Sequence, residues 1–171
     1  MVVVKWHGHA CVEIVTSRGY SIVVDPHDGK SIGLEKPQAR ADLVLITHDH
    51  FDHNAYSVVA YEKTRVLKEF IGETRVDDVR IEGLLTYHDK FGGKRRGKNT
   101  VYLIEVEGQK IAHLGALGHI PDEAVLNKLK NVDLLVIPVG GTYTIYPDEA
   151  WRIVELTTPN NVMPIHYWIE G

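Results

Sequence analysis

Residues 47–53 read Thr-His-Asp-His-Phe-Asp-His, and this stretch decides how the whole chain is interpreted. Five of its seven side chains can bind a metal ion, because imidazole nitrogens and carboxylate oxygens are ligands of Zn²⁺ and similar cations. In extended backbone His48 and His50 project to the same side and can share one ion. Asp52 and His53 follow as the chain turns and can reach a second ion beside it. The stretch therefore predicts a metal-binding loop.

The residues before this loop, 42–46, form an apolar run of β-forming residues that is typical of a short buried strand. The loop then stands at the carboxyl end of a strand, where sheet-based proteins usually place binding chemistry. His88 and His166 also stand at or just after predicted strand ends. Histidines that are distant in sequence can in this way converge at one edge of a sheet.

The first part of the chain indicates hairpins, and the second part alternates strands with helices. Strands are expected over residues 2–6, 10–16, 20–25, 64–68, 80–87, 99–107, 109–114, 132–139 and 162–165, and helices over 54–62, over 121–130 and from 147 onward. This mixture predicts an α/β fold in which two mixed sheets pack together with helices outside. No linker or low-complexity segment interrupts the pattern, so we expect one domain over residues 1–171.

Composition narrows the class of protein. A chain of 171 residues, 44% hydrophobic and 25% charged, is ordinary for a globular protein with one sizeable core. The formal net charge of -4 argues against nucleic acid as the main partner. The single cysteine, Cys11, excludes an internal disulfide and is interpreted as a small buried side chain. No apolar stretch approaches membrane-spanning length and residues 1–7 lack signal-peptide features, so we expect no membrane partner and a cytoplasmic protein.

Two features leave alternatives open. Asp25 ends a predicted strand before Pro26, where it either caps the turn or accepts a hydrogen bond from a ligand imidazole and fixes its tautomer. Residues 89–98 are basic and rich in glycine. For this segment we favour a solvated hairpin loop, and the alternative is an anion clamp over the metal site for phosphate or carboxylate. It is not a P-loop, because the Gly-Lys-Ser/Thr ending is absent.

At this point the chain resembles the metallo-β-lactamase superfamily. The motif that carries the resemblance is His-x-His-x-Asp-His at residues 48–53, and the similarity continues through His88, Gly115 and His166. Within the superfamily the chain looks most like the small metal-dependent hydrolases related to the ascorbate-lactonate lactonases. The segments behind that likeness are residues 8–10, 24–27, 113–115, 138–144 and 164–167. The resemblance implies a four-layer αββα sandwich with a two-metal site between the sheets.

The resemblance also implies the ligands of that site. By the family pattern one ion is held by His48, His50 and His88, and the other by Asp52, His53 and His166. Zinc suits an imidazole-rich set, while manganese and iron stay open on ligand type. Two such cations lower the pKa of a shared water molecule, which then attacks a carbonyl or phosphoryl centre. Asp52 is the expected catalytic residue, orienting the nucleophile or accepting a proton.

One position departs from the family pattern. The family carries an aspartate after the glycine at Gly115, and its carboxylate bridges the two ions, whereas this chain has Ala116. Three explanations stay open: an engineered variant, a natural member that binds one ion or holds two weakly, and a non-catalytic relative. Asp89 or His119 would be the residues to compensate. Further contacts to ligands or substrate are expected from Asp25, His9, His119, Gly141 and Thr142.

Three functions follow from these features. The first is a metal-dependent hydrolase of a small ester, lactone or phosphodiester. The second is a metal-dependent nuclease, which the acidic net charge opposes and only Arg95 and Arg96 support locally. The third is a non-catalytic metal- or ligand-binding relative, kept open by Ala116. We expect a small-molecule substrate, and a homo-oligomer stays open.

Overall fold

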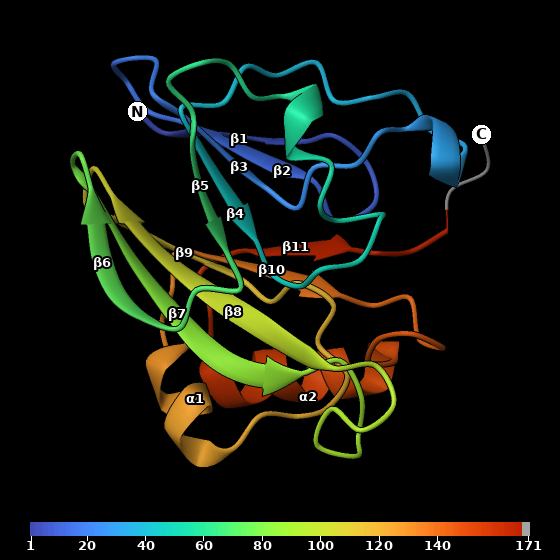
Figure 1. Ribbon diagram of the computed structural model, residues 1–171. Helices are drawn as coiled ribbons and strands as arrows, with labels where there is room; N and C mark the ends of the chain where they lie inside the picture. Colours follow the sequence, from blue (N-terminus) through green and yellow to red (C-terminus); the bar gives the residue numbers. More distant parts are fainter. Residues whose placement is uncertain (169–171) are drawn as a thin grey trace.

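The computed structural model describes residues 1–168 and consists of two mixed β-sheets packed face to face (Figure 1). The first sheet has the order β1 (Val3–Trp6), β2 (Val12–Val15), β3 (Ser21–Val24), β4 (Leu43–Ile46) and β5 (Arg65–Lys68). The second has the order β11 (Val162–Ile165), β10 (Leu134–Pro138), β9 (Gln109–His113), β8 (Lys98–Val106), β7 (Val79–Tyr87) and β6 (Gly72–Val76). The two mixed sheets predicted from the sequence are confirmed.

Strand direction changes once in each sheet. In the first sheet β1, β2 and β3 are antiparallel, and β4 and β5 continue parallel to β3. In the second sheet β6 to β9 are antiparallel, and β10 and β11 continue parallel to β9. The antiparallel segments are the hairpins that the sequence indicated. The parallel additions require the crossovers that carry the loops and helices.

The main core lies between the sheets. Along β4 the side chains alternate, so that Leu43 and Leu45 pack into the core between the sheets while Val44 and Ile46 face outward. Tyr102 of β8 is fully buried in the same core, and its hydroxyl donates a hydrogen bond of 3.0 Å to the carbonyl oxygen of Ile46. This bond ties the second sheet to the end of β4, directly before the metal-binding loop.

The two outer faces are covered differently. The helices α1 (Glu123–Lys128) and α2 (Pro147–Thr157) pack against the second sheet (Figure 1). The first sheet is instead covered by loops with two 3-10 turns, Lys30–Ile32 and Tyr56–Val58. The fourth layer of the αββα sandwich is therefore built mainly from loops. Among residues 1–168, each helix is too short or too polar to cross a membrane.

The helix expected over residues 54–62 was a wrong prediction, because only the turn Tyr56–Val58 forms there. The apolar side chains that face the sheet, Val58 and Val59, are adjacent in sequence. Adjacent positions are about 100° apart around a helix, so this pair gives no apolar stripe to bury. The helix expected over residues 121–130 is present but shorter, spanning Glu123–Lys128.

Candidate metal centre

The metal-binding loop begins at an edge that both sheets share. Thr47 follows β4, and its carbonyl oxygen accepts a hydrogen bond of 2.8 Å from the backbone N–H of Thr100 in the second sheet. The backbone then curls, with the N–H of His50 donating to His48 at 3.1 Å and the N–H of His53 donating to His50 at 2.9 Å. These successive turns collect the loop side chains at the end of the core.

The first two histidines of the loop join His88, which follows β7, in a group that we call the three-histidine cluster. The ligand atoms of His48, His50 and His88 lie within 4.8 Å of one another. His48 Nε2 and His88 Nδ1 are buried and have no hydrogen-bond partner among residues 1–168. Leaving a buried polar atom unpaired costs about 1–3 kcal/mol, and a cation bound by these lone pairs would remove that cost. The cluster therefore fits a metal ion.

The remaining loop ligands join two residues from distant segments in a second group, the carboxylate cluster, which consists of His9, Asp52, His53 and His166. His53 Nε2 lies 3.3 Å from His166 Nε2 and 3.4 Å from Asp52 Oδ2. Nitrogen or oxygen ligands at about 2.0–2.1 Å from a tetrahedral zinc ion stand about 3.3–3.4 Å apart. His9 Nε2 is only 2.8 Å from Asp52 Oδ2, which is a hydrogen-bond distance. Asp52, His53 and His166 thus match the ligand spacing, with His9 bonded to their carboxylate.

A single buried carboxylate orients a histidine in each cluster. Asp25 accepts hydrogen bonds from His53 Nδ1 at 2.8 Å and from the Thr47 hydroxyl at 2.6 Å. The hydroxyl lies 2.8 Å from His48 Nδ1, and because its proton points to Asp25 it must accept from that ring. Both imidazoles therefore carry their proton on Nδ1 and present Nε2 to the clusters. Orienting partners of this kind fix the tautomer of metal-binding histidines.

Burial keeps the imidazoles of His48, His88 and His166 neutral. It lowers the pKa of His48 to about 2, that of His88 to about 4 and that of His166 to about 3, with the neighbouring histidines adding to the effect. Burial would also lower the pKa of His53, but Asp25 and Asp52 outweigh it and raise that pKa to about 9, so a bound cation would displace a proton there. Burial alone would raise the pKa of Asp25, but His53 outweighs it and lowers that pKa to about 2. Neutral imidazoles and an ionised carboxylate are the protonation states that metal binding requires.

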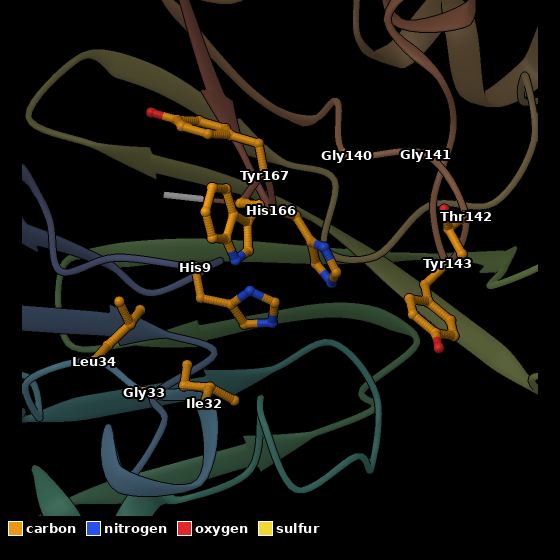
Figure 2. A pocket seen from close by; sticks show the side chains of 11 residues that line it. His9, Ile32, Gly33, Leu34, Gly140, Gly141, Thr142, Tyr143, His166 and Tyr167 are labelled. Carbon is orange, nitrogen blue, oxygen red and sulfur yellow. The ribbon is translucent and has the colours of Figure 1, made fainter. Parts of the chain in front are cut away.

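A cavity of about 500 Å³ opens at the carboxylate cluster (Figure 2). The imidazoles of His9 and His166 point into it, with Ile32 and Leu34 on one side and Tyr143 on another. The predicted contact residues Gly141 and Thr142 also line it, as do Gly140, Tyr167 and Trp168. Position 140 requires glycine, because a Cβ there would lie only 2.0 Å from the carbonyl oxygen of His166. The cavity is thus a binding space bordered by the ligand imidazole of His166 and by His9.

The residues expected to compensate for Ala116 point elsewhere. Asp89 accepts four backbone hydrogen bonds within its own loop, and His119 bonds through its ring to the backbone of Tyr87 and Ile120. Neither residue belongs to a cluster that could hold a metal within residues 1–168. Ala116 itself is fully buried, and its backbone N–H donates to Asn99 Oδ1 at 3.0 Å. Its methyl group offers no ligand atom.

Ala116 lies beside the orienting network. The preceding Gly115 has a φ of 60°, and a Cβ there would stand 2.7 Å from the side chain of Thr47. Only glycine allows this close approach between the turn after β9 and the start of the metal-binding loop. Ala116, where the family resemblance implies a bridging carboxylate, is therefore next to the residue that orients His48.

Comparisons with known proteins agree with this architecture. Residues 3–166 match the beta-lactamase superfamily domain. The chain belongs to this superfamily. A metal-dependent hydrolase of Thermococcus onnurineus, of the group named UPF0173, is 36% identical to this superfamily member over 98% of the chain and 85% of the relative. The crystal structure of a metallo-beta-lactamase superfamily protein of Thermotoga maritima is also 36% identical, with a TM-score of 0.81 over 99% of this chain and 78% of that one.

The fold likeness extends to more distant proteins. A Parabacteroides distasonis protein of 21% identity has a TM-score of 0.83 over 99% of this chain and 84% of its own. Sequence reasoning had not identified Thr47 as the link between Asp25 and His48, nor Ile32 and Leu34 as a cavity wall. The signals for these residues are weak: a hydroxyl before the first histidine, and two isolated apolar residues in a polar loop.

Proposed function

We propose that this protein is a metal-dependent hydrolase that activates water at a two-ion centre to cleave a small ester, lactone or phosphodiester. The observation that carries this proposal is the contact between the two clusters, where the rings of His48 and His53 lie 4.1 Å apart between centroids. The Thermotoga maritima relative is named for zinc dependence. Zinc also suits the imidazole-rich ligands, and manganese and iron are the alternatives.

Divalent cations held there would lower the pKa of water and would stabilise the negative charge that develops on the attacked carbonyl or phosphoryl group. The residues of the chain supply the rest. Asp25 and Thr47 hold His48 and His53 in their ligand tautomers. Burial raises the pKa of Asp52, but the neighbouring imidazoles of His53 and His9 outweigh it and hold that pKa well below its usual range. The ionised carboxylate of Asp52 is assigned to orient the attacking water.

The test is metal content by elemental analysis together with hydrolysis of three reporters: a 4-nitrophenyl ester, a γ-lactone and bis(4-nitrophenyl) phosphate. We expect turnover of at least one reporter, lost on chelation and restored by zinc. Asp52→Ala should lose turnover, while Arg152→Gln on the exposed face of α2 should keep it. Full metal content without turnover of any reporter would contradict the hydrolase proposal.

That outcome would favour the non-catalytic metal-binding alternative, which Ala116 specifically supports because the position offers no carboxylate. The nuclease alternative has a separate test, since binding through Arg95 and Arg96 to nucleic acid phosphates would weaken steeply with salt. Salt-sensitive binding to a single-stranded oligonucleotide, followed by its cleavage, would replace the small-molecule proposal. We expect neither binding nor cleavage, in keeping with the net charge of -4.

A further inference from the structure

The loop after His88 is built as a rigid unit. We call residues 89–98 the basic loop. The carboxylate of Asp89 accepts hydrogen bonds of 2.7–2.9 Å from four backbone N–H groups, those of Phe91, Gly93, Arg95 and Arg96. Burial raises the pKa of Asp89, but these donors outweigh it and lower the pKa to about 2. The negative charge of Asp89 is thus used to hold the loop backbone.

The guanidinium of Arg96 is fixed in place without being neutralised. It donates a hydrogen bond of 2.7 Å to the carbonyl oxygen of Thr142 and lies 4.6 Å from the ring centroid of Tyr143. Neither contact is with a carboxylate, and an arginine has five N–H donors, so donors remain for a ligand. Lys90 differs, because its ammonium group is paired with Glu149 at 2.6 Å. Arg96 is therefore the positioned cation of the basic loop.

A second cavity, of about 270 Å³, lies between the basic loop and residues 142–146. His88 of the three-histidine cluster lines it together with Arg95 and Arg96. The second cavity is consequently a small space with a cationic wall on one side and a ligand imidazole on another.

The two cavities share a common wall. Thr142 and Tyr143 line both the second cavity and the larger one of Figure 2. The larger cavity borders His9 and His166, whereas the smaller one borders His88. The metal centre is thus flanked by a basic space beside one cluster and a partly apolar space beside the other. A substrate that occupies both spaces would extend from His88 of the three-histidine cluster to His166 of the carboxylate cluster.

We propose that the smaller cavity is an oxyanion subsite, in which Arg96, together with the neighbouring Arg95, binds a carboxylate or phosphate group carried by the substrate. Arginine suits this role because its planar guanidinium pairs with both kinds of oxyanion through two parallel hydrogen bonds. The remainder of the substrate then extends past Thr142 and Tyr143 into the larger cavity. This inference rests on the proposed hydrolase function for its substrate, but not for the binding of the anion.

The first experiment compares a matched pair of esters on the metal-loaded protein: neutral 4-nitrophenyl butyrate and the singly charged mono-4-nitrophenyl ester of glutaric acid. We expect a higher kcat/KM for the anionic ester. In Arg96→Gln this preference should fall by about 10- to 100-fold, the size expected for hydrogen bonds to a charged group. Arg96→Lys should restore part of it, and Arg152→Gln should leave it intact. Equal losses of kcat/KM for both esters would mean that Arg96 only holds the basic loop to Thr142 through its hydrogen bond. That result would overturn the proposal.

The second experiment measures binding of inorganic phosphate to the metal-loaded protein by calorimetry, and it does not depend on turnover. We expect Kd to rise at least about tenfold in Arg96→Gln and to stay unchanged in Arg152→Gln. An unchanged Kd in Arg96→Gln would show that phosphate binds at the metal centre alone, and this result or no binding would overturn the subsite. If phosphate binding depends on Arg96 but neither ester is hydrolysed, the subsite is retained and ester hydrolysis is rejected. Turnover of both esters without a preference for the anionic one would retain the hydrolase function and reject the subsite.

Discussion

The two metal-binding clusters differ in how their polar atoms are satisfied. In the three-histidine cluster His48 Nε2 and His88 Nδ1 are buried and unpaired within residues 1–168. In the carboxylate cluster the side chains satisfy one another, with Asp52 bonded to His9 and His53 bonded to Asp25. In the first cluster a cation would therefore supply the missing partners of two buried nitrogens. In the second cluster the side chains already have hydrogen-bond partners within the protein. The two ions should therefore differ in how they respond to mutation.

The largest effect should come from removing a ligand of either cluster. His88→Ala and Asp52→Ala should each lower kcat/KM by more than about 100-fold, beyond the loss typical of orienting residues. Each variant should keep one ion by elemental analysis, because the other cluster retains its ligands. Loss of both ions in each variant would mean that the clusters act as a single unit. Arg152→Gln is the control for preparation and handling.

The next effect separates the clusters through their shared carboxylate. Asp25→Asn should weaken both ions by about 10- to 100-fold. Asp25 Oδ2 accepts from His53 and the Thr47 hydroxyl, and Oδ1 accepts from the Thr47 backbone N–H, whereas an amide replaces one of these two acceptor oxygens with an NH₂ donor. Thr47→Val removes the hydroxyl that links Asp25 to His48 but leaves the bond between His53 and Asp25, so it should weaken one ion and spare the other. Competition with a chelator gives a separate dissociation constant for each ion and so measures the two effects. Equal effects of the two substitutions on both ions would refute independent orientation.

A smaller gain is expected at Ala116. Ala116→Asp would add a buried carboxylate beside Gly115 and Thr47, and we expect roughly tenfold tighter binding of the more weakly held ion. Ala116→Asn, of the same size but uncharged, should not reproduce the gain. The aspartate variant should reach two ions per chain at a lower free metal concentration than the unchanged chain. Two tightly held ions in the unchanged chain as well would show that the bridging carboxylate is dispensable.

The smallest effect concerns the loop next to the three-histidine cluster. Asp89→Asn should lower stability by about 1 kcal/mol, or roughly 2–4 °C in Tm, because the charge-assisted bonds to the backbone are weakened. The pKa of Asp89 is lowered from 3.8 to about 2, so its stabilisation is complete above about pH 4 and is lost as pH falls toward 2. Thermal melts should therefore converge for the two proteins near pH 2. A constant difference down to pH 2 would exclude this origin.

Much of the centre could be predicted from the chain alone because residue type and spacing carry it. The positions of histidines after predicted strands indicated one shared site, and the family resemblance implied its ligands: His48, His50, Asp52, His53 and the distant His88 and His166. The structure brings these six into two adjacent clusters. For the basic loop, the pattern favoured a solvated hairpin. The contacts of Arg96 with Thr142 and Tyr143, which are distant in sequence, instead support the anion clamp.

Strand periodicity and ligand chemistry are local properties, so the sequence by itself determined the two mixed sheets, the metal-binding loop and the absence of a ligand atom at Ala116. The features that depend on contacts between segments far apart in sequence were decided only by the tertiary structure. It linked Asp25 through Thr47 to His48, bonded His9 to Asp52 and turned His119 toward Tyr87. The physical reason is that hydrogen bonds and cavities act over a few ångströms in space. Only the packing of two sheets and their loops sets such distances between residues far apart in sequence.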